Sequence, residues 1–517
     1  MKKLFLSWLL LLLVIGVFAQ SYKIEVKIKG VENQDIILGH HKNDKLIPVD
    51  TVKTDKNGYA VFKGDKPLFQ GMYFIFLPQK TYFDILIGED QVFYIENDTT
   101  DLYKNLKAKG SDELQVFLDY HNFLIEQNEN ITNLREKWKN ETDPNKKKEL
   151  EEEMNVISGK FETYYQEIVT NYPDMFFTTF LKATRDVKVP ETITDRAAQY
   201  YYYKNHYFEN FDVSDKRLYY TNIYESKIDN YLDKVVLQDP DTLIVAVDYL
   251  IEKTEGDEEL YQYMMIHLFN KYATSNLMIA ENMYVHVGEI YAEKATWSTD
   301  SFRNELKTKI VRKKNCLIGN KALALRMTIL PPDSAAIENL RIPLEIMKEQ
   351  GLDIEKDKSR TFEEKVPDLS QLIAEYMSFF PNDRPLYDTQ SKYTILWFIS
   401  PDCSHCKKET PLFHADFMDK LKGKDVEVWA IYMEKNTDNW AKFSNDIGDW
   451  FDFIEKNKLY GQGWYNMWNP FDNYRFKYDI NSSPILYLLD KDKKILAKRI
   501  GYEQAIEIIL ELEKREQ

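Results

Sequence analysis

The stretch that decides the fold of this chain is PDCSHC, residues 401–406, which follows the apolar run YTILWFI at 393–399. A continuous apolar run of this length is typical of a strand that is buried on both faces of a parallel sheet. The residues after 406 predict a helix, because Leu412–Leu421 carries helical spacing. Two cysteines separated by two residues therefore stand at a strand-to-helix turn.

The spacing of Cys403 and Cys406 suits dithiol chemistry. On the first turn of a helix, residues three apart share a face, with Cβ atoms about 5–6 Å apart. A small adjustment brings such a pair to the ~3.5–4.5 Å of a disulfide. The leading cysteine lies where unpaired backbone N–H groups and the helix dipole stabilise a thiolate. The second cysteine is covered by the helix and can attack a mixed disulfide from within.

Two other interpretations of this pair remain open. A metal site would need two more ligands, and Cys316 with eight scattered histidines gives no paired spacing. A permanent structural disulfide would close only a two-residue loop, which stabilises a fold little. The sequence therefore favours a redox-active dithiol with no metal and no cofactor. Cys316 is unpaired by count, and we expect it to be a buried, inert thiol rather than a third redox residue.

The region around the dithiol alternates strands and helices, which predicts an α/β domain over residues 313–517. Residues 331–388 are expected to be an insertion. Further strands are expected at Val426–Tyr432, Ile485–Leu489 and Ile495–Ile500, and a further helix at Gln504–Leu512.

This domain resembles the thioredoxin-like family, and specifically its TlpA/ResA-type branch of exported thiol–disulfide oxidoreductases. The resemblance implies that Pro484 follows a cis peptide bond and faces the disulfide, and that the Ser483 backbone pairs with a substrate strand. X-Pro bonds take the cis form readily enough for that. The segments that carry the likeness are IGNKA at 318–322, WF at 397–398, CSHC at 403–406, KKETP at 407–411, SSP at 482–484 and LDKD at 489–492.

The sequence departs from thioredoxin itself at two positions. Trp397 stands where thioredoxin carries a buried Asp, so a proton acceptor for the buried thiol must come from elsewhere, with Glu409 and Asp402 as candidates. Asp402 itself stands where Trp is common. An imidazole at His405 would stabilise the Cys403 thiolate and make the disulfide more oxidising, whereas the TlpA/ResA branch is mostly reducing. The family resemblance favours a reductase over an oxidase or isomerase.

The first residues of the chain predict export. Lys2 and Lys3 precede the apolar run 4–18, and VFA at 17–19 is a small-residue cleavage pattern, so residues 1–19 are expected to be a signal peptide. An N-terminal membrane anchor is the alternative, but the run is shorter than the ~20 residues that a membrane span needs. We therefore expect the mature chain in the periplasm or cell envelope, without stable membrane insertion.

Composition excludes several classes of function. Lys plus Arg is 68 and Asp plus Glu is 84, a net charge of −16, which gives no electrostatic reason to bind nucleic acid or anionic lipid. Three cysteines exclude a disulfide-dense scaffold and a four-thiolate zinc site. Hydrophobic residues at 44% and charged residues at 29% are ordinary for a folded soluble protein.

Residues 20–110 predict a β-rich, sandwich-like domain of antiparallel strands. Apolar and charged residues alternate over 22–29, and Asn57-Gly58 is a tight-turn dipeptide between two strand-like segments. The stretch resembles the N-terminal domain of unknown function that precedes thioredoxin-like domains in some bacterial envelope proteins. The residues that carry this likeness are DTV at 50–52, Asp55, Gly58, Phe62 and GMY at 71–73.

Residues 111–312 predict an α-helical domain. An apolar stripe with spacings of four and three runs from Leu150 to Ile168 and marks one helix face. The run Tyr200–Tyr203 favours packing inside a helical bundle over a ligand-stacking surface. A domain of this kind is consistent with a spacer or a partner-docking module.

The sequence thus predicts an exported thiol–disulfide oxidoreductase. Its expected partners are substrate proteins with disulfides and a membrane dithiol electron donor, with Cys403 attacking and Cys406 resolving. The alternative is an envelope binding or scaffold protein in which the thioredoxin-like domain is accessory, because residues 20–312 lie outside that domain.

Overall fold

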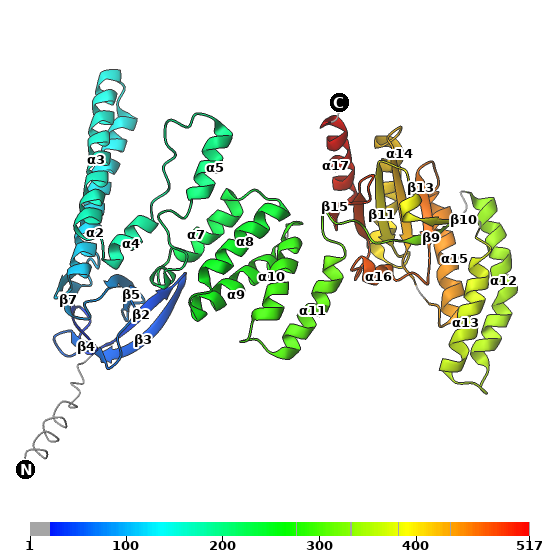
Figure 1. The fold of residues 1–517 in the computed structure, drawn as a ribbon, viewed down its shortest axis with the longest axis horizontal. Coiled ribbons are helices and arrows are strands. Elements are labelled where there is room, and N and C mark those ends of the chain that lie inside the picture. Colours follow the sequence, from blue (N-terminus) through cyan, green and yellow to red (C-terminus); the bar gives the residue numbers. More distant parts are fainter. Residues whose placement is uncertain (1–20, 276, 331–332, 381, 435, 516–517) are drawn as a thin grey trace, which may run out of the picture. The chain divides into compact units, whose positions relative to one another are not determined.

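The computed structural model describes residues 21–275, 277–330, 333–380, 382–434 and 436–515. The expected signal peptide, residues 1–19, lies outside them. The chain divides into two compact units, Met1–Met264 and Met265–Gln517. Along the sequence, N-terminal sheets are followed by a helical middle part and a sheet-containing C-terminal part (Figure 1).

The described N-terminal strands form two four-stranded sheets, in the orders β4-β1-β7-β8 and β3-β2-β5-β6. Neighbouring strands are antiparallel except β1 and β7, which run parallel. The prediction that all strands of this region are antiparallel is therefore wrong for β1 and β7. The whole second sheet separates these strands in sequence, and a long crossover permits parallel pairing. The strands are β1 (Tyr22–Lys29), β2 (Asp35–Lys42), β3 (Lys45–Lys53), β4 (Tyr59–Gly64), β5 (Gly71–Phe76), β6 (Tyr82–Ile87), β7 (Val92–Asp98) and β8 (Lys107–Lys109).

The Asn57-Gly58 turn carries the chain from one N-terminal sheet to the other rather than closing a hairpin, because β4 pairs with β1 and not with β3. Gly58 has φ +74°, and a Cβ there would lie 2.1 Å from the carbonyl oxygen of Ile28. Only glycine fits this backbone and this close approach. Ile24, Ile28 and their neighbours on the inward face are fully buried in a core that both sheets share.

The middle of the chain is helical, as the sequence predicts. Helices α2 and α3 are joined by a short loop and lie side by side (Figure 1). Asp143 caps α3 by accepting from the backbone of Asn145, and Pro144 opens the helix, where a missing N–H costs nothing. The helices are α2 (Asp112–Asn140), α3 (Pro144–Asn171), α4 (Phe176–Ala183), α5 (Arg196–His206), α6 (Lys216–Tyr219), α7 (Tyr224–Asn230), a π-helical turn (Tyr231–Val235), α8 (Pro240–Thr254), α9 (Glu258–Thr274), α10 (Ala280–Lys294) and α11 (Asp300–Lys314).

The C-terminal part is built on a seven-stranded sheet with the order β10-β9-β13-β12-β11-β14-β15. Strands β11, β12 and β13 run parallel, and β14, β15, β9 and β10 are antiparallel to their neighbours. The elements are β9 (Arg326–Ile329), α12 (Ser334–Lys356), α13 (Phe362–Met377), β10 (Asn382–Pro385), a 3-10 turn (Leu386–Asp388), β11 (Tyr393–Ile399), α14 (Ser404–Lys420), β12 (Val426–Tyr432), α15 (Trp440–Asn457), β13 (Trp464–Trp468), α16 (Tyr474–Lys477), β14 (Ile485–Leu489), β15 (Ile495–Lys498) and α17 (Tyr502–Arg515).

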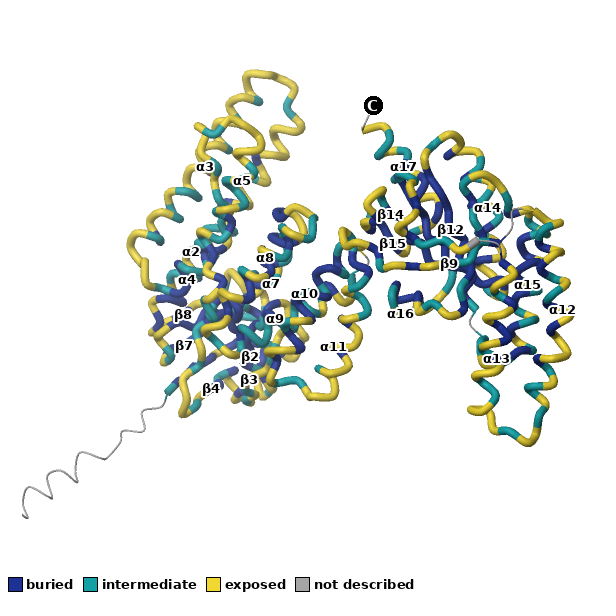
Figure 2. The backbone as a smooth tube through the Cα atoms, turned by 45° about the vertical axis from the view of Figure 1, so that its right-hand side comes forward, coloured by how far each residue is buried: buried dark blue, intermediate teal, exposed yellow. Residues whose placement is uncertain are grey.

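Every residue of β11 and β12 is buried, which is visible as the dark strands at the centre of this sheet (Figure 2). One face packs against helices α12 to α15 and α17, and the other packs against residues that include Cys316, Tyr474 and Tyr478. The insertion 331–388 holds α12 and α13. Because β11, β12 and β13 are parallel, their carboxyl ends meet at one edge of the sheet, where α14 begins.

Candidate active site

The two cysteines stand at the junction of β11 and α14. Cys403 is the N-cap residue of α14. Cys406 lies in the first turn and is fully buried, whereas Cys403 is half-buried. Both are free thiols in this structure. The strand-to-helix turn thus presents one sulfur towards solvent and keeps the other beneath it.

The loop that precedes β14 lies against the dithiol. The Cys403 thiol donates to the backbone carbonyl oxygen of Ser483 at 3.3 Å, and the Ser483–Pro484 peptide bond is cis. Pairing of Phe398 with Ile485 places this loop beside the end of β11. The structure therefore brings Ser483 and Pro484, which the family resemblance implies as substrate-binding residues, to Cys403 and Cys406.

The pKa of Cys403 lies below its ordinary value. Partial burial opposes ionisation, but several hydrogen bonds to the sulfur outweigh it. They come from the backbone and thiol of Cys406, from the side chain of Ser483, and from the backbone of His405. Charge on this sulfur is stabilised because donors already point at it, as expected at a helix N-terminus.

Burial raises the pKa of Cys406 to about 12. A backbone hydrogen bond from Ser400 and the side chain of Ser483 favour its ionised form, but the neighbouring Cys403 opposes it. Cys406 therefore stays protonated over the physiological pH range, whereas Cys403 ionises easily. The pKa values of two thiols three residues apart are thus shifted in opposite directions.

His405 and the two candidate proton acceptors lie differently from the cysteines. The side chains of His405 and Asp402 are exposed, so the contribution of His405 to the low pKa of Cys403 comes from its backbone. The charge of Asp402 acts on Asp446, and that of Glu409 acts on Tyr502 in α17. The effect of the His405 imidazole and the proton acceptor for Cys406 stay predictions.

Sequence reasoning missed a polar group at the edge of the sheet. The Ser400 hydroxyl donates to Glu434 Oε1 at 2.9 Å and accepts from the Asp402 backbone at 3.3 Å. Burial raises the pKa of Asp446, and the charges of Glu434 and Asp402 add to the effect. The order of the strands could have indicated this group, since Ser400 and Glu434 lie one and two residues after the ends of the parallel neighbours β11 and β12.

Cys316 is buried, as predicted, on the face of the sheet opposite the dithiol. Its thiol donates to the carbonyl oxygen of Lys313 at 3.5 Å, and Lys498 Nζ lies 3.7 Å from the sulfur. No sequence pattern indicated that Lys498 would lie beside Cys316. The sheet separates Cys316 from Cys403 and Cys406, so Cys316 is not part of this site.

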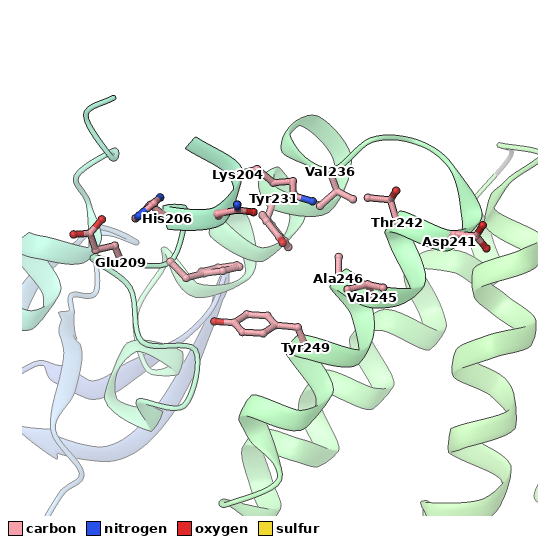
Figure 3. A pocket seen from close by; sticks show the side chains of 12 residues that line it. Lys204, His206, Glu209, Tyr231, Val236, Asp241, Thr242, Val245, Ala246 and Tyr249 are labelled. Atoms are coloured by element: carbon pink, nitrogen blue, oxygen red, sulfur yellow. The ribbon is translucent and has the colours of Figure 1, made fainter. Parts of the chain in front are cut away.

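Apart from the dithiol site, the chain contains a pocket in its helical part, at the C-terminal end of α5, with a volume of about 840 Å³ (Figure 3). We call this pocket the hollow. Tyr231, Val245 and Tyr249 form part of an apolar floor, and Val245 is 70% exposed. The rim carries two basic and two acidic side chains. They are Lys204, His206, Glu209 and Asp241. In the Tyr200–Tyr203 run on α5, Tyr201 is exposed and the others are half-buried.

The described part of the chain contains no cluster of three His, Cys, Asp or Glu side chains that could hold a metal ion. Among the same residues, no helix is both long enough and apolar enough to cross a membrane.

Two family models match separate parts of the chain. A domain of unknown function, DUF4369, matches residues 22–117, and a second one, DUF5106, matches residues 141–313. The first covers the region where the sequence resembles such a domain. No curated protein matches the chain.

Solved structures with partial likeness to the chain include thioredoxin-like proteins. One from Bacteroides caccae is 18% identical and covers 63% of this chain and 97% of its own, with a TM-score of 0.39. A domain of a possible thiol-disulfide isomerase from Cytophaga hutchinsonii is 28% identical over 38% of this chain and 95% of its own, with a TM-score of 0.25. The thioredoxin domain of a thiol-disulfide oxidoreductase from Bacteroides vulgatus is 24% identical over 25% of this chain and 86% of its own, with a TM-score of 0.22.

Proposed function

We propose that the protein is an exported thiol–disulfide oxidoreductase of the TlpA/ResA-type thioredoxin-like branch, acting on protein disulfides in the periplasm or cell envelope. The observation that carries the proposal is the contrast between two adjacent thiols: a half-exposed Cys403 with a lowered pKa and a buried Cys406 with a pKa of about 12. In this proposal residues 313–517 are the thioredoxin-like domain, and residues 20–110 and 111–312 are a sandwich-like and a helical domain.

The chemistry follows from the two thiols. The Cys403 thiolate attacks one sulfur of a substrate disulfide, a mixed disulfide forms, and the other substrate sulfur leaves as a thiolate that takes a proton from solvent. Cys406 then loses its proton and attacks the Cys403 sulfur. The substrate leaves as a dithiol with two electrons gained, and Cys403 and Cys406 are left as a disulfide. A membrane dithiol returns two electrons and two protons to the pair.

Ser483 fits the role of a substrate contact. In the reduced protein its carbonyl oxygen accepts from the Cys403 thiol. Once Cys403 is ionised, the sulfur has no proton to donate, and this carbonyl becomes free to accept from a backbone N–H of a bound substrate strand. Ionisation of the attacking sulfur and exposure of the substrate contact are thereby linked, with Pro484 beside them.

We favour the reductase direction over oxidase or isomerase. The TlpA/ResA resemblance supports it, and the largest contribution of His405 to the pKa of Cys403 comes from its backbone rather than from its exposed side chain. His405 would act by lowering that pKa further when protonated, which would favour the oxidising direction.

The experiment that tests the proposal is mixed-disulfide trapping. Cys406→Ala leaves the attacking thiol but removes the resolving one, so covalent complexes with envelope proteins should accumulate. Cys403→Ala is the matched control and should trap far fewer, while Cys316→Ala should behave as the unmodified protein. Equal trapping by the Cys406 and Cys403 variants would rule out this route of turnover.

The second candidate function is a binding or scaffold protein of the envelope, and the hollow beside α8 is the observation that favours it. Val245→Glu places a charge in that hollow without disturbing the core, because Val245 is 70% exposed. Val156→Glu on α3 is the control, since Val156 is 64% exposed and does not line the hollow. If Val245→Glu abolishes the cellular phenotype while Cys403→Ser/Cys406→Ser leaves it unchanged, binding is the principal function.

A further inference from the structure

The loop that touches the dithiol is anchored at Asp479, four residues before Ser483. The side chain of Asp479 is only 8% exposed, although it is a carboxylate. Arg499 donates both to its Oδ2 and to its backbone carbonyl oxygen, each at 2.8 Å. Asp479 has φ +48°, a left-handed backbone that non-glycine residues seldom adopt. A buried charge in this conformation needs partners that fix it in place.

Two of those partners come from the end of α11. Arg312 Nε and Lys313 Nζ each lie 3.6 Å from a carboxylate oxygen of Asp479. Arg312 also donates to the side-chain amide oxygen of Asn481 at 3.4 Å. Asn481 is closer in sequence than Asp479 to the cis Ser483–Pro484 bond. The last turn of α11 therefore holds the base of the loop at two points. These two residues also end the region that DUF5106 matches.

A second carboxylate ties the same turn to the sheet. Glu281 on α10 pairs with Lys313 at 2.6 Å and with Lys498 at the end of β15. The side chain of Lys498 is 4% exposed and that of Glu281 is 16% exposed. Burial would raise the pKa of Glu281, but Lys498 and Lys313 lower it further than burial raises it, so the carboxylate stays charged. Helices α10 and α11 are thus joined to the sheet through a continuous set of ion pairs.

We propose that the α10–α11 pair positions the 479–484 loop against the dithiol through the Asp479 carboxylate, which makes Asp479 a positioning residue with Arg312 and Lys313 as its anchors. This inference rests on the proposed redox function of Cys403. It gives the end of the helical region a role in that function: the helices set how firmly Ser483 is held beside the two sulfurs.

The consequence is a change in thiol reactivity when the anchors are removed. The Ser483 side chain stabilises the ionised forms of both Cys403 and Cys406. A loosened loop withdraws that hydrogen bond, so the Cys403 thiolate becomes harder to form. The amides of residues 479–483 should also exchange with solvent more rapidly, because the loop opens more often.

The test compares two variants with opposite charge changes. Arg312→Gln/Lys313→Gln removes two positive charges, and Asp479→Asn removes one negative charge while keeping the shape of the side chain. In the reduced full-length protein, the alkylation rate of Cys403 is followed against pH by peptide mass spectrometry. Both variants should move the midpoint upward by about one pH unit, which leaves roughly tenfold less thiolate below the midpoint. A direct field effect of the Asp479 charge would lower the midpoint instead.

The matched control removes two positive charges elsewhere on α11. Lys309 and Lys314 pair with Glu305 and Glu289 and do not contact the loop. Lys309→Gln/Lys314→Gln should keep both the alkylation midpoint and the exchange rate of 479–483. A wild-type midpoint in Asp479→Asn, or a downward shift, would overturn the proposal. Exchange of the amides of residues 479–483 separates failure of the anchoring from failure of the redox function. Unchanged exchange in both loop variants refutes the anchoring, whatever the alkylation rate of Cys403.

Discussion

Cys403 and Cys406 have different thiol pKa values because they occupy different positions on the first turn of one helix. Cys403 caps the helix and meets hydrogen-bond donors, whereas Cys406 lies fully buried behind it. Desolvation penalises a charge on the second sulfur, and pre-aligned donors stabilise a charge on the first. In the proposed reaction, this contrast lets the Cys403 thiolate attack a substrate disulfide while Cys406 stays protonated until the mixed disulfide has formed.

A pH profile of thiol reactivity follows from this contrast. The pKa of Cys403 is lowered, so its thiolate is present above that pKa and is lost as the pH falls through it. Cys406, with a pKa of about 12, stays protonated throughout. Limiting iodoacetamide at mildly acidic pH should therefore label Cys403 first, and Cys316 and Cys406 much later. Labelling of buried Cys316 at a comparable rate would contradict this ranking.

For individual residues, the sequence predicted what depends on the spacing between neighbours in the chain. It missed the contacts between residues that are distant in sequence. The CSHC motif at 403–406 was enough to place the two thiols at the start of one helix, because the spacing of one helical turn fixes their relative position. The place of Ser483 came only from family resemblance. The Ser400–Glu434 hydrogen bond and the Lys498–Cys316 contact join segments more than thirty residues apart, and no local pattern encodes such meetings.

At the scale of elements, the site depends on how β11 is fixed to α14. The indole N–H of Trp397 on β11 donates to the Thr410 hydroxyl on α14 at 3.1 Å, and both residues are buried. Trp397 thus ties the strand to the helix and carries no titratable group.

Thr410→Val should test this link. Valine keeps the shape but leaves the buried indole N–H without its acceptor, which should lower the free energy of unfolding by about 1–3 kcal/mol. Thr410→Ser is the control and keeps the hydroxyl, so it should cost less. Urea unfolding of the full chain measures both. A larger loss in Thr410→Ser than in Thr410→Val would show that the methyl group, and not the hydrogen bond, stabilises the junction.

The turn between the two N-terminal sheets gives a second prediction at this scale. Gly58→Ala places a Cβ 2.1 Å from the Ile28 carbonyl oxygen. It also forces alanine into a left-handed backbone that alone costs about 1–2 kcal/mol. Gly159→Ala in α3 meets no atom within 4 Å and should stabilise that helix by about 0.5–1 kcal/mol. Opposite shifts in thermal midpoint are expected, and a neutral Gly58→Ala would contradict the assigned turn.

Elements were predictable where hydrophobic patterns are strong. The ranges of β11, β12 and β14 agree with the expected Tyr393–Ile399, Val426–Tyr432 and Ile485–Leu489, because each strand is a mostly apolar run. Helices α12 and α13 went unpredicted inside the insertion. Pro343 and Pro367 lie within them, and proline argues locally against a helix interior.

At the scale of the whole molecule, ion pairs join elements that are distant in sequence. In the N-terminal unit, Glu259 on α9 accepts from Lys42 on β2 at 2.9 Å and from the Tyr220 hydroxyl at 2.7 Å, and it pairs with Lys216 at 3.0 Å. Burial alone would raise the pKa of Glu259, but these three partners lower it to about 2.

This cluster should make the N-terminal unit sensitive to acid. The folded pKa of about 2 lies below the ordinary 4.5, so the unfolded chain binds more protons between these values and stability falls with pH there. Glu259→Gln should lower the thermal midpoint at pH 7, and the difference should shrink as the pH falls from 4.5 towards 2. Glu258→Gln, at an exposed neighbouring position, should change little at any pH. A deficit in Glu259→Gln that persists at pH 2 would contradict the ion-pair account.

The reduction potential of the Cys403–Cys406 pair decides whether these two thiols are redox-active. Full-length protein is equilibrated in buffers of defined dithiol–disulfide ratio, and the state of the pair is read by mass spectrometry of the alkylated peptides. A redox-active dithiol predicts one two-electron transition between about −270 and −120 mV, the range of known dithiol proteins. A disulfide below about −300 mV, typical of structural bonds, or no Cys403–Cys406 disulfide at all, would contradict the proposed function.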